Sequence, residues 1–337
     1  MSTPTAFNSA NYLTAIKGML SLGGHSVPVF EGTASSGRIQ NIAVGATVAT
    51  PILISFTSAS TFEVAEASTP TVPFATGTVG NPLTSSVVNF TAVGAFAAGS
   101  TVALTVYPAP PILRDTATEL VCAIQRGTAT AYLAFTPTTL VGAPALLVGT
   151  GPAFNNTLPI LSQADMQVAY MPYASAESLT AYHRFDGSTF TLRTSNGASV
   201  RTCSAGFLHS FLSPLDFSHP LYAGGPVNTS LQYAAHTFTN RSNFRTPSGT
   251  STPIATTQSA SMAVLDYWTP ALDPLPLLPI HAHATGLNTF AHFPHVYLQP
   301  RNLNTSTIYY TQAEQLVPTY TNTSTDFGNT FLFSAQL

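Results

Sequence analysis

The sequence contains very few charged side chains. Of its 337 residues, 7% are Asp, Glu, Lys or Arg, whereas about 25% is usual for a soluble domain. Lys17 is the only lysine, and the formal net charge is −3. Residues 1–110 carry two positive and three negative groups, and residues 111–337 carry eight and ten. Neither part is basic, so the electrostatic pattern of a nucleic-acid-binding protein is missing.

Cysteine and long apolar runs are also scarce. Cys122 and Cys203 are the only cysteines, and two distant thiols do not form a disulfide framework. We interpret them as buried thiols in a reducing cytoplasm. No stretch approaches the ~20 apolar residues of a membrane-spanning helix. Residues 1–22 lack the basic start and continuous apolar core of a secretion signal. The sequence therefore predicts neither a membrane protein nor a disulfide-stabilised one.

The most uniform stretch, residues 39–109, is rich in Val, Ile, Ala, Thr and Ser and contains only Glu63 and Glu66 as charges. Short apolar runs recur in it between Gly, Pro and Ser/Thr clusters; they are residues 42–44, 52–56, 61–64, 86–90 and 101–107. Such runs are typical of strands, and their spacing predicts a β-sandwich or small barrel. In the last run, Val102, Leu104 and Val106 alternate with polar or aromatic neighbours, so they are expected to face the core.

The flanking segments give further local predictions. Residues 8–21 have helical apolar spacing, with Asn8 or Ser9 as the cap, and predict a short first helix. A terminal arm docking on a neighbour would have the same pattern. Residues 108–111, Pro-Ala-Pro-Pro, predict a joint between domains. Residues 114–126 fit an amphipathic helix or a long strand, and the pattern does not distinguish them.

A β-hairpin is predicted at residues 181–193, because Asp186-Gly187 separates two alternating runs. Beside this turn, His183, Arg184 and Asp186 are expected to form a surface ion pair. Residues 305–311 and 329–334 are strand candidates near the end of the sequence. No period of 20 to 50 residues repeats, which argues against a solenoid or propeller.

Histidines are concentrated late in the chain, at positions 281, 283, 292 and 295. On a strand, His281 and His283 would point to the same face and would bind one metal ion. A threefold assembly would then collect three such pairs into a six-nitrogen site. The alternative interpretation is that these histidines pack or hydrogen-bond beside neighbouring aromatic residues, since no nearby Asp or Glu would orient the rings.

Motifs of the common enzyme classes are absent. The sequence has no Gly-x-Ser-x-Gly, no His-Glu-x-x-His, no Gly-x-Gly-x-x-Gly and no phosphate-binding loop. A metal-dependent enzyme using the histidines remains an alternative, as does a carbohydrate- or receptor-binding adhesin. For the adhesin, Trp268, Tyr267 and Tyr297 are the candidate contact residues. A polypeptide with so little charge has little colloidal protection as a monomer. We therefore expect much of its surface to meet other subunits, the alternative being a secreted β-protein kept soluble by hydroxyl groups.

The chain resembles the structural proteins of tailed-bacteriophage virions. The features are the Ala/Thr/Val-rich β-module at residues 39–107, the proline-rich hinge at residues 108–111 and a second β-rich part with runs such as residues 218–225, SHPLYAGG. The resemblance implies an immunoglobulin-like module. It also implies that His281 and His283 echo the His-x-His pairs that hold axial iron in phage tail fibres and tail tips. A fibre shaft would show repeats, so a globular tail, baseplate or capsid-associated component is favoured.

The combined prediction is a mainly β protein. An immunoglobulin-like β-sandwich or small barrel is followed by a larger β-rich domain with long proline-rich loops and one or two short helices. The predicted boundaries are an N-terminal arm or short helix at 1–24, the sandwich at 25–107, a Pro-rich joint at 108–113 and the second domain at 114–337.

The predicted function is a non-enzymatic virion component, of the tail or baseplate, assembled in the host cytoplasm. Its partners are copies of itself and other virion proteins, with a host-surface glycan or receptor as a further contact. Neither nucleic acid nor membrane is expected as a partner. No cofactor is predicted apart from iron or zinc at the histidine pair. The alternatives are a capsid decoration protein and an adhesin.

Overall fold

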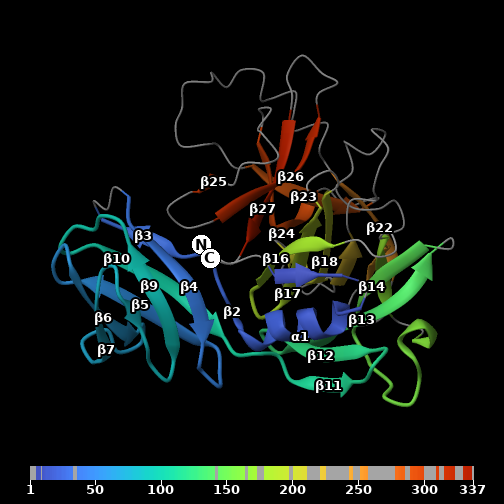
Figure 1. Ribbon diagram of the computed structural model, residues 1–337, viewed down its shortest axis with the longest axis horizontal. Coiled ribbons are helices and arrows are strands. Elements are labelled where there is room, and N and C mark those ends of the chain that lie inside the picture. The colour runs from blue at the N-terminus through green and yellow to red at the C-terminus, as the bar shows by residue number, and fades with distance from the viewer. Residues whose placement is uncertain are drawn as a thin grey trace.

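The structure is a computed structural model that describes residues 5–8, 10–32, 36–140, 143–163, 166–172, 178–196, 200–210, 221–224, 243–245, 251–256, 278–284, 289–299, 309–310, 315–322 and 329–335. In these residues the strands form four antiparallel sheets, accompanied by one short α-helix (Figure 1). The prediction of a mainly β protein is therefore confirmed. No helix within the described ranges is long and apolar enough to cross a bilayer.

The strands of residues 24–107 lie together at one side of the molecule (Figure 1). They are β2 (Gly24–His25), β3 (Val29–Glu31), β4 (Arg38–Val44), β5 (Thr50–Phe56), β6 (Thr61–Glu66), β7 (Pro73–Thr78), β8 (Pro82–Leu83), β9 (Val88–Val93) and β10 (Thr101–Tyr107). One sheet has the order β2-β10-β5-β6-β7, with β3 also paired to β10, and the other has the order β4-β9-β8. Four of the five apolar runs predicted as strands fall within strands, and the run 86–90 begins two residues before β9, whereas β7 and β8 were not predicted.

These two sheets share one apolar core. Val102, Leu104 and Val106 are buried in it while Thr101 and Thr105 are half-buried, as the alternation predicted. The other buried members are Ile39, Ile42, Ile52, Ile54, Phe56, Phe62, Val64, Leu83, Val88, Phe90, Ala92 and Phe96. The ring centroids of Phe56 and Phe96 lie 3.8 Å apart in a stacked pair. Burial of these side chains is the main favourable term in forming such a core, at about 1.5–3 kcal/mol for each large aliphatic or aromatic group.

Residues 112–172 form a five-stranded meander. Its strands are β11 (Ile112–Asp115), β12 (Leu120–Arg126), β13 (Ala129–Leu140), β14 (Ala143–Gly151) and β15 (Gln167–Pro172), paired in sequence order. A short 3₁₀ helix, η1 (Ile160–Ser162), lies in the loop between β14 and β15. The ambiguous stretch 114–126 is thus strand. It lacked clean alternation because β12 is buried on both faces, with Leu120 and Cys122 on one side and Val121 on the other.

The remaining strands form the largest sheet. They are β1 (Thr5–Phe7), β16 (Leu179–Phe185), β17 (Thr189–Ser195), β18 (Val200–Phe207), β19 (His209–Ser210), β20 (Leu221–Gly224), β21 (Asn243–Arg245), β22 (Ser251–Thr256), β23 (Leu278–Ala284), β24 (Thr289–Gln299), β25 (Tyr309–Tyr310), β26 (Gln315–Asn322) and β27 (Asn329–Ala335). The predicted hairpin is β16 and β17, in register from Thr180↔Ser195 to Phe185↔Phe190. Of the strand candidates near the end of the sequence, 329–334 lies within β27, and 305–311 contains β25, its other residues lying outside the described ranges.

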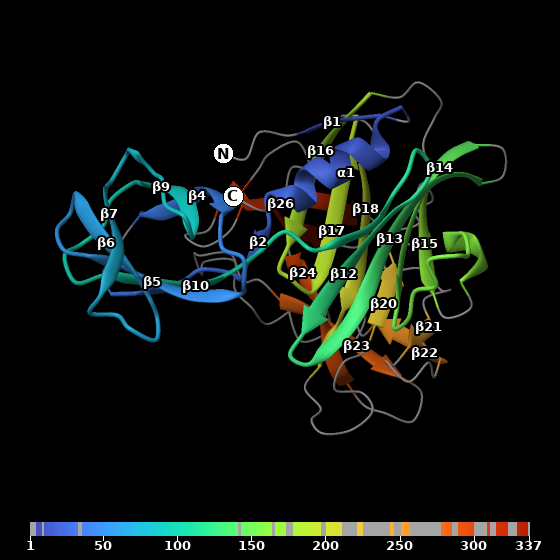
Figure 2. The same ribbon diagram turned by 90° about the horizontal axis from the view of Figure 1, so that it is seen from below.

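The predicted first helix is α1 (Tyr12–Ser21). Its N-cap is Asn11 rather than Asn8 or Ser9. The Asn8 side-chain oxygen accepts from the Ala10 N–H at 2.9 Å, one residue before the cap. α1 is not a free arm: Tyr12, Ile16 and Leu20 are buried among side chains of β12–β14 and β16–β18 (Figure 2). Strand β1 likewise pairs with β16. Residues 5–21 therefore pack with the part of the chain that follows residue 112.

Both cysteines lie in a second apolar core, the one that buries the inner side of α1. Cys122 on β12 and Cys203 on β18 are buried and not bonded to each other. Burial raises the pKa of the Cys122 thiol to about 12, opposed by a backbone hydrogen bond from Leu133. The prediction of two buried thiols is confirmed, and at neutral pH Cys122 behaves as a small apolar side chain.

Candidate functional site

A polar cluster lies at the turn between β16 and β17, next to Tyr107 at the end of β10. The β16–β17 turn places Asp186 there, and Oδ1 of Asp186 accepts from the Ser188 N–H at 2.9 Å, the Ser188 hydroxyl at 3.0 Å and the Thr189 N–H at 2.7 Å. Gly187 follows with φ +85°, which favours glycine. A Cβ at Gly187 would also meet the Tyr107 ring at 2.5 Å. The turn residues thus hold the carboxylate and leave its second oxygen facing inward.

That second oxygen meets two histidines from distant parts of the chain. Nε2 of His295, on β24, lies 2.8 Å from Asp186 Oδ2. Nε2 of His209, on β19, lies 3.4 Å from the same oxygen. His295 is only 5% exposed and has φ 63°, a left-handed conformation that non-glycine residues rarely adopt. The carboxylate therefore fastens β24 and β19 to the β16–β17 turn.

Electrostatics favours an ionised Asp186 beside a neutral His295. Burial by itself opposes ionisation of Asp186, but His295 and His209 outweigh it and hold the pKa of the carboxyl well below its usual value. Burial lowers the pKa of His295, and Asp186 only partly offsets this. His295 thus donates its Nε2 hydrogen to the carboxylate. An ionised acceptor makes these hydrogen bonds stronger than neutral ones.

A second set of polar groups adjoins the first. Arg184 is fully buried on β16, and its Nη2 donates to the His25 carbonyl on β2 at 3.0 Å. His25 is also fully buried; its Nδ1 donates to the Ser26 carbonyl at 2.8 Å, and its Nε2 has no hydrogen-bond partner. Burial, followed by Arg184, lowers the pKa of His25 well below 6.5 and that of His183 to about 4. The cationic arginine is therefore accompanied by uncharged imidazoles.

This arrangement corrects one expectation. His183, Arg184 and Asp186 do not form a surface ion pair: Arg184 and Asp186 are buried, 0% and 7% exposed, and they bond to groups far away in sequence. Chemically, the site lacks the order that activates a hydroxyl nucleophile, in which a histidine stands between an acid and a serine. Ser188 and His295 both donate to the same carboxylate. The cluster links the β16–β17 turn to β19 and β24.

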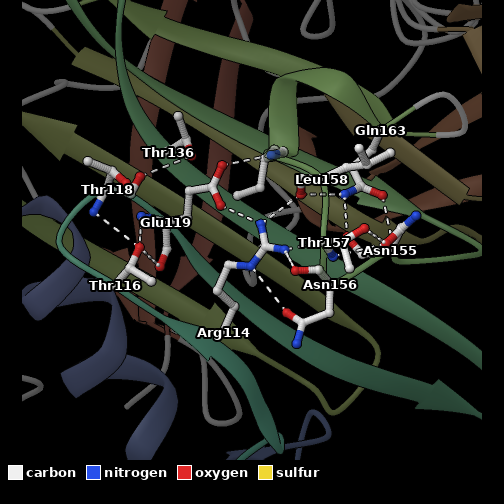
Figure 3. Close-up of polar contacts among 11 residues, drawn as sticks. Arg114, Thr116, Thr118, Glu119, Thr136, Asn155, Asn156, Thr157, Leu158 and Gln163 are labelled. Carbon is white, nitrogen blue, oxygen red and sulfur yellow. Dashed lines mark hydrogen bonds and ion pairs between the residues drawn. The ribbon is translucent and has the colours of Figure 1, made fainter.

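A second built polar site, shown in Figure 3, holds the loop between β14 and β15. Arg114 on β11 lies between Glu119 and residues 155–158 of that loop. Its Nη1 lies 2.5 Å from Glu119 Oε2 and donates to the Leu158 carbonyl at 2.9 Å, while Nη2 donates to the Asn156 carbonyl. Glu119 Oε1 accepts from the Ile160 N–H at 2.7 Å.

The loop also supports itself. Gln163 Nε2 donates to the carbonyls of Asn155 and Leu158, at 2.8 and 2.9 Å, and Oε1 of Gln163 accepts from the Asn155 N–H at 3.0 Å. Ile160 is buried against Val121 and its neighbours on the outer face of the five-stranded sheet. We call Arg114, Glu119 and the loop residues that they hold the clamp. Its members come from three separate segments, so no local sequence pattern predicted it.

The predicted metal residues lie on a backbone that brings histidines near one another. His281 and His283 both belong to β23, where His281 is paired with His292 of β24. On its other side, His292 is paired with His209 of β19. Within the described ranges, however, no group of three or more His, Cys, Asp or Glu is arranged to hold a metal ion. The metal site therefore stays a prediction.

The predicted contact aromatics are placed only in part. Trp268 and Tyr267 lie outside the described residues. Tyr297 lies on β24, paired with Pro279 on one side and Leu332 on the other, and is half-buried. Tyr297 therefore lies in an inner strand of the largest sheet.

Comparison with known proteins yields little. No family model matches the sequence, and no curated protein matches it. Among solved structures, FlgL of Xanthomonas campestris shows a partial similarity, with 20% identity and a TM-score of 0.20 over 25% of this chain and 29% of that one. A similarity of this extent carries no inference about fold or function.

Proposed function

We propose that this protein is a non-enzymatic structural component of a bacteriophage virion, most simply of the tail or baseplate. It acts by assembling with copies of itself and with neighbouring virion proteins. Residues 25–107 are proposed to be an immunoglobulin-like β-sandwich, made of the two sheets that share a core. The second part of the chain, residues 114–337, is proposed to carry the polar cluster around Asp186.

The observation that carries the proposal is the edge strand β7. It pairs with β6 and ends the order of its sheet. Phe74, Thr76 and Thr78 of β7 are exposed, Ala75 and Gly77 are half-buried, and the strand has no charged residue. Val72 just before it is 65% exposed. Free soluble proteins protect such an edge with lysine, an inward charge, a proline, a bulge or a covering segment. β7 begins with Pro73 and faces a register shift at Val64 and Ala65 of β6, but it carries no charge. An edge without charge suits a protein whose edges pair with other subunits.

The scarcity of charge supports the same proposal. In the described part of residues 36–107, the charged side chains are Arg38, Glu63 and Glu66. Interfaces made from such a surface depend on apolar contact and backbone pairing, which salt does not screen. The buried polar groups of the Asp186 cluster bond to groups from distant segments of the same chain. They support a scaffold better than a catalyst.

The test is a charge placed on the β7 edge. Thr76→Lys would bring like charges together wherever two β7 strands pair, and it would block pairing with another apolar edge. Thr47→Lys, at an exposed position in the β4–β5 loop, is the matched control. Light scattering after size exclusion should show multimers for wild type and Thr47→Lys, and smaller species for Thr76→Lys. A wild-type monomer would refute the proposed assembly.

A further inference from the structure

Two apolar cores in the described residues belong to different parts of the chain. The first takes its buried members from residues 39–106 and fills the space between the two sheets of residues 24–107, which we call the N-terminal sheets. The second takes its buried members from residues 7–20 and 120–223. Because neither core contains a residue of the other, the contact between the two parts lies outside both. Domains joined in this way move relative to one another unless a large apolar interface holds them.

Strand β2 makes this contact. It pairs with the end of β10 and so belongs to the N-terminal sheets, and it lies between them and the β16–β17 hairpin (Figure 2). On the side of β16, a Cβ at Gly24 would come within 2.0 Å of the Phe185 carbonyl oxygen. The buried Arg184 donates to the His25 carbonyl at 3.0 Å. Backbone packing and a side-chain hydrogen bond therefore hold β2 to β16.

The His25 ring has no acceptor for a second proton in this contact. It is fully buried, and Nδ1 donates its hydrogen to the Ser26 carbonyl at 2.8 Å. Nε2 is then the nitrogen that would take up a proton, and it has no hydrogen-bond partner among the described residues. Protonation would create a buried cationic donor without an acceptor, which is strongly unfavourable. Burial, followed by Arg184, accordingly lowers the pKa of His25 well below 6.5.

The groups that act on His25 electrostatically come from β16 and β24. They are Arg184 and His183 on β16 and His295 on β24, and each disfavours a charged His25. The carboxylate of this region, Asp186, accepts from His295 at 2.8 Å, and Nε2 of His209 lies 3.4 Å from the same oxygen. That carboxylate is therefore already engaged by two other imidazoles.

The other elements around β2 carry few titratable groups. β10 ends in Tyr107, and β12 ends in Arg126. α1 carries Lys17, which pairs with Asp115, and β4 carries Arg38 at the end away from its contact with residue 22. These groups are a phenol and three cations, apart from the carboxylate that Lys17 already pairs. In the described residues, a charge on His25 would thus be relieved by water rather than by a protein group.

Separation of β2 from β16 would bring the His25 ring into water, where a protonated imidazole is stable. The chain crosses between the two parts at residues 22–23 and at the proline-rich joint, residues 108–111, so the parts would stay connected. We propose that protonation of His25 opens the contact between β2 and β16, so that the N-terminal sheets swing away from the second part while both stay folded. This opening needs no second copy of the chain and is independent of the proposed assembly.

The size of the effect follows from proton linkage. The open form binds the proton with the ordinary histidine pKa of about 6.5, and the closed form binds it with a lower one. The closed form is therefore fully favoured above pH 6.5 and loses its advantage as the pH falls below that value. Each unit by which the pKa is lowered favours opening by up to about tenfold. At pH 5, the ratio of open to closed molecules should be at least about tenfold higher than at pH 7.5.

The test is energy transfer between two dyes on the full-length chain, measured from pH 7.5 to pH 4.5. Thr47→Cys and Ala117→Cys place the dyes at exposed positions on the two sides of the contact. The native Cys122 and Cys203 are buried and stay unlabelled. An excess of unlabelled protein prevents transfer between copies, and circular dichroism of the same samples reports whether the strands persist.

Transfer should fall below pH 6.5 while the circular dichroism stays constant. In His25→Gln, which has no titrating ring at this position, the rise in the ratio of open to closed molecules at pH 5 should be about tenfold smaller. His183→Gln is the matched control, because it removes a neighbouring buried imidazole that stays on β16 when β2 leaves. This control should keep the rise seen in the wild type.

Four outcomes would overturn the proposal. One is constant transfer down to pH 4.5, and another is a loss of transfer and of circular dichroism at the same pH, which is unfolding rather than opening. Both are read from the chain with His25 in place, so they decide the matter even if His25→Gln does not fold. The others are a rise in His25→Gln as large as in the wild type, and an equal reduction in His25→Gln and His183→Gln.

Discussion

Asp186 accepts a hydrogen bond of 2.8 Å from His295, a residue 109 positions later in the chain. The two meet because the β16–β17 turn directs the carboxylate inward and β24 brings the imidazole to it. Both side chains are nearly out of contact with solvent. This hydrogen bond links β24 to the β16–β17 turn. Its removal should lower the free energy of unfolding of the protein.

The first prediction concerns that carboxylate. Asp186→Asn removes the charge and turns an amide N–H toward donors on His295 and His209 or on the turn backbone. The free energy of unfolding should fall by about 2–4 kcal/mol. Asp115→Asn, which breaks only the exposed pair with Lys17, should cost about 1 kcal/mol or less. Urea unfolding at pH 7 measures both, and equal effects would mean that the buried cluster contributes nothing special.

The second prediction is a loss of stability in acid. His25 and His183 have pKa values lowered in the folded state by burial and by Arg184, that of His183 to about 4. The unfolded chain therefore binds more protons below its own histidine pKa of about 6.5. The stability that these groups contribute is complete above pH 6.5 and is lost as pH falls from there toward 4.

For His183 alone this amounts to about 1–2 kcal/mol at pH 5. His183→Gln does not titrate, so the difference in unfolding free energy between pH 7.5 and pH 5 should be smaller by that amount in the variant. Urea midpoints at the two pH values measure it. A variant that loses as much stability as wild type between pH 7.5 and pH 5 would exclude a role for His183.

The third prediction compares two glycines. A Cβ at Gly24 would lie 2.0 Å from the Phe185 carbonyl oxygen, so Gly24→Ala forces β2 and β16 apart and should destabilise the protein by more than about 3 kcal/mol. Gly18 lies on the exposed side of α1 with nothing near its Cβ position. Gly18→Ala should raise stability by about 0.5–1 kcal/mol. Thermal unfolding of the two variants should therefore shift in opposite directions.

The fourth prediction concerns the clamp. Arg114→Ala leaves Glu119 largely buried without its cation and leaves loop carbonyls without donors, which should cost about 2–4 kcal/mol. Glu119→Gln keeps an oxygen for the Ile160 N–H, and should cost less. Hydrogen exchange should show faster exchange in residues 155–163 of Arg114→Ala. Unchanged protection there would mean that Arg114 does not hold the loop.

How much of the fold could be predicted depended on how far apart in the sequence the contacting residues lie. The strand at residues 101–107 follows from alternation, because it has one face in the core and one outside it, whereas β7, which buries no residue, was not predicted. The hairpin at Asp186-Gly187 follows from local turn chemistry. The stretch 114–126 remained ambiguous because a strand buried on both faces, as β12 is, has no alternation.

The polar sites were not predictable for a different reason. Asp186, His209 and His295, like Arg114 and Asn156, come from segments that no local pattern connects. Arg184 was expected at the surface because arginine is rarely buried. It is buried with a hydrogen bond to the His25 carbonyl of β2, a residue 159 positions earlier that no local pattern connects to it.

The central claim is that this sparsely charged surface serves contacts between subunits. Sedimentation velocity of the wild-type protein at low and at high salt tests it most directly. We predict a multimer whose mass does not fall when salt is raised, because apolar contact and strand pairing are not screened. A monodisperse monomer at high protein concentration, in either salt, would contradict the claim.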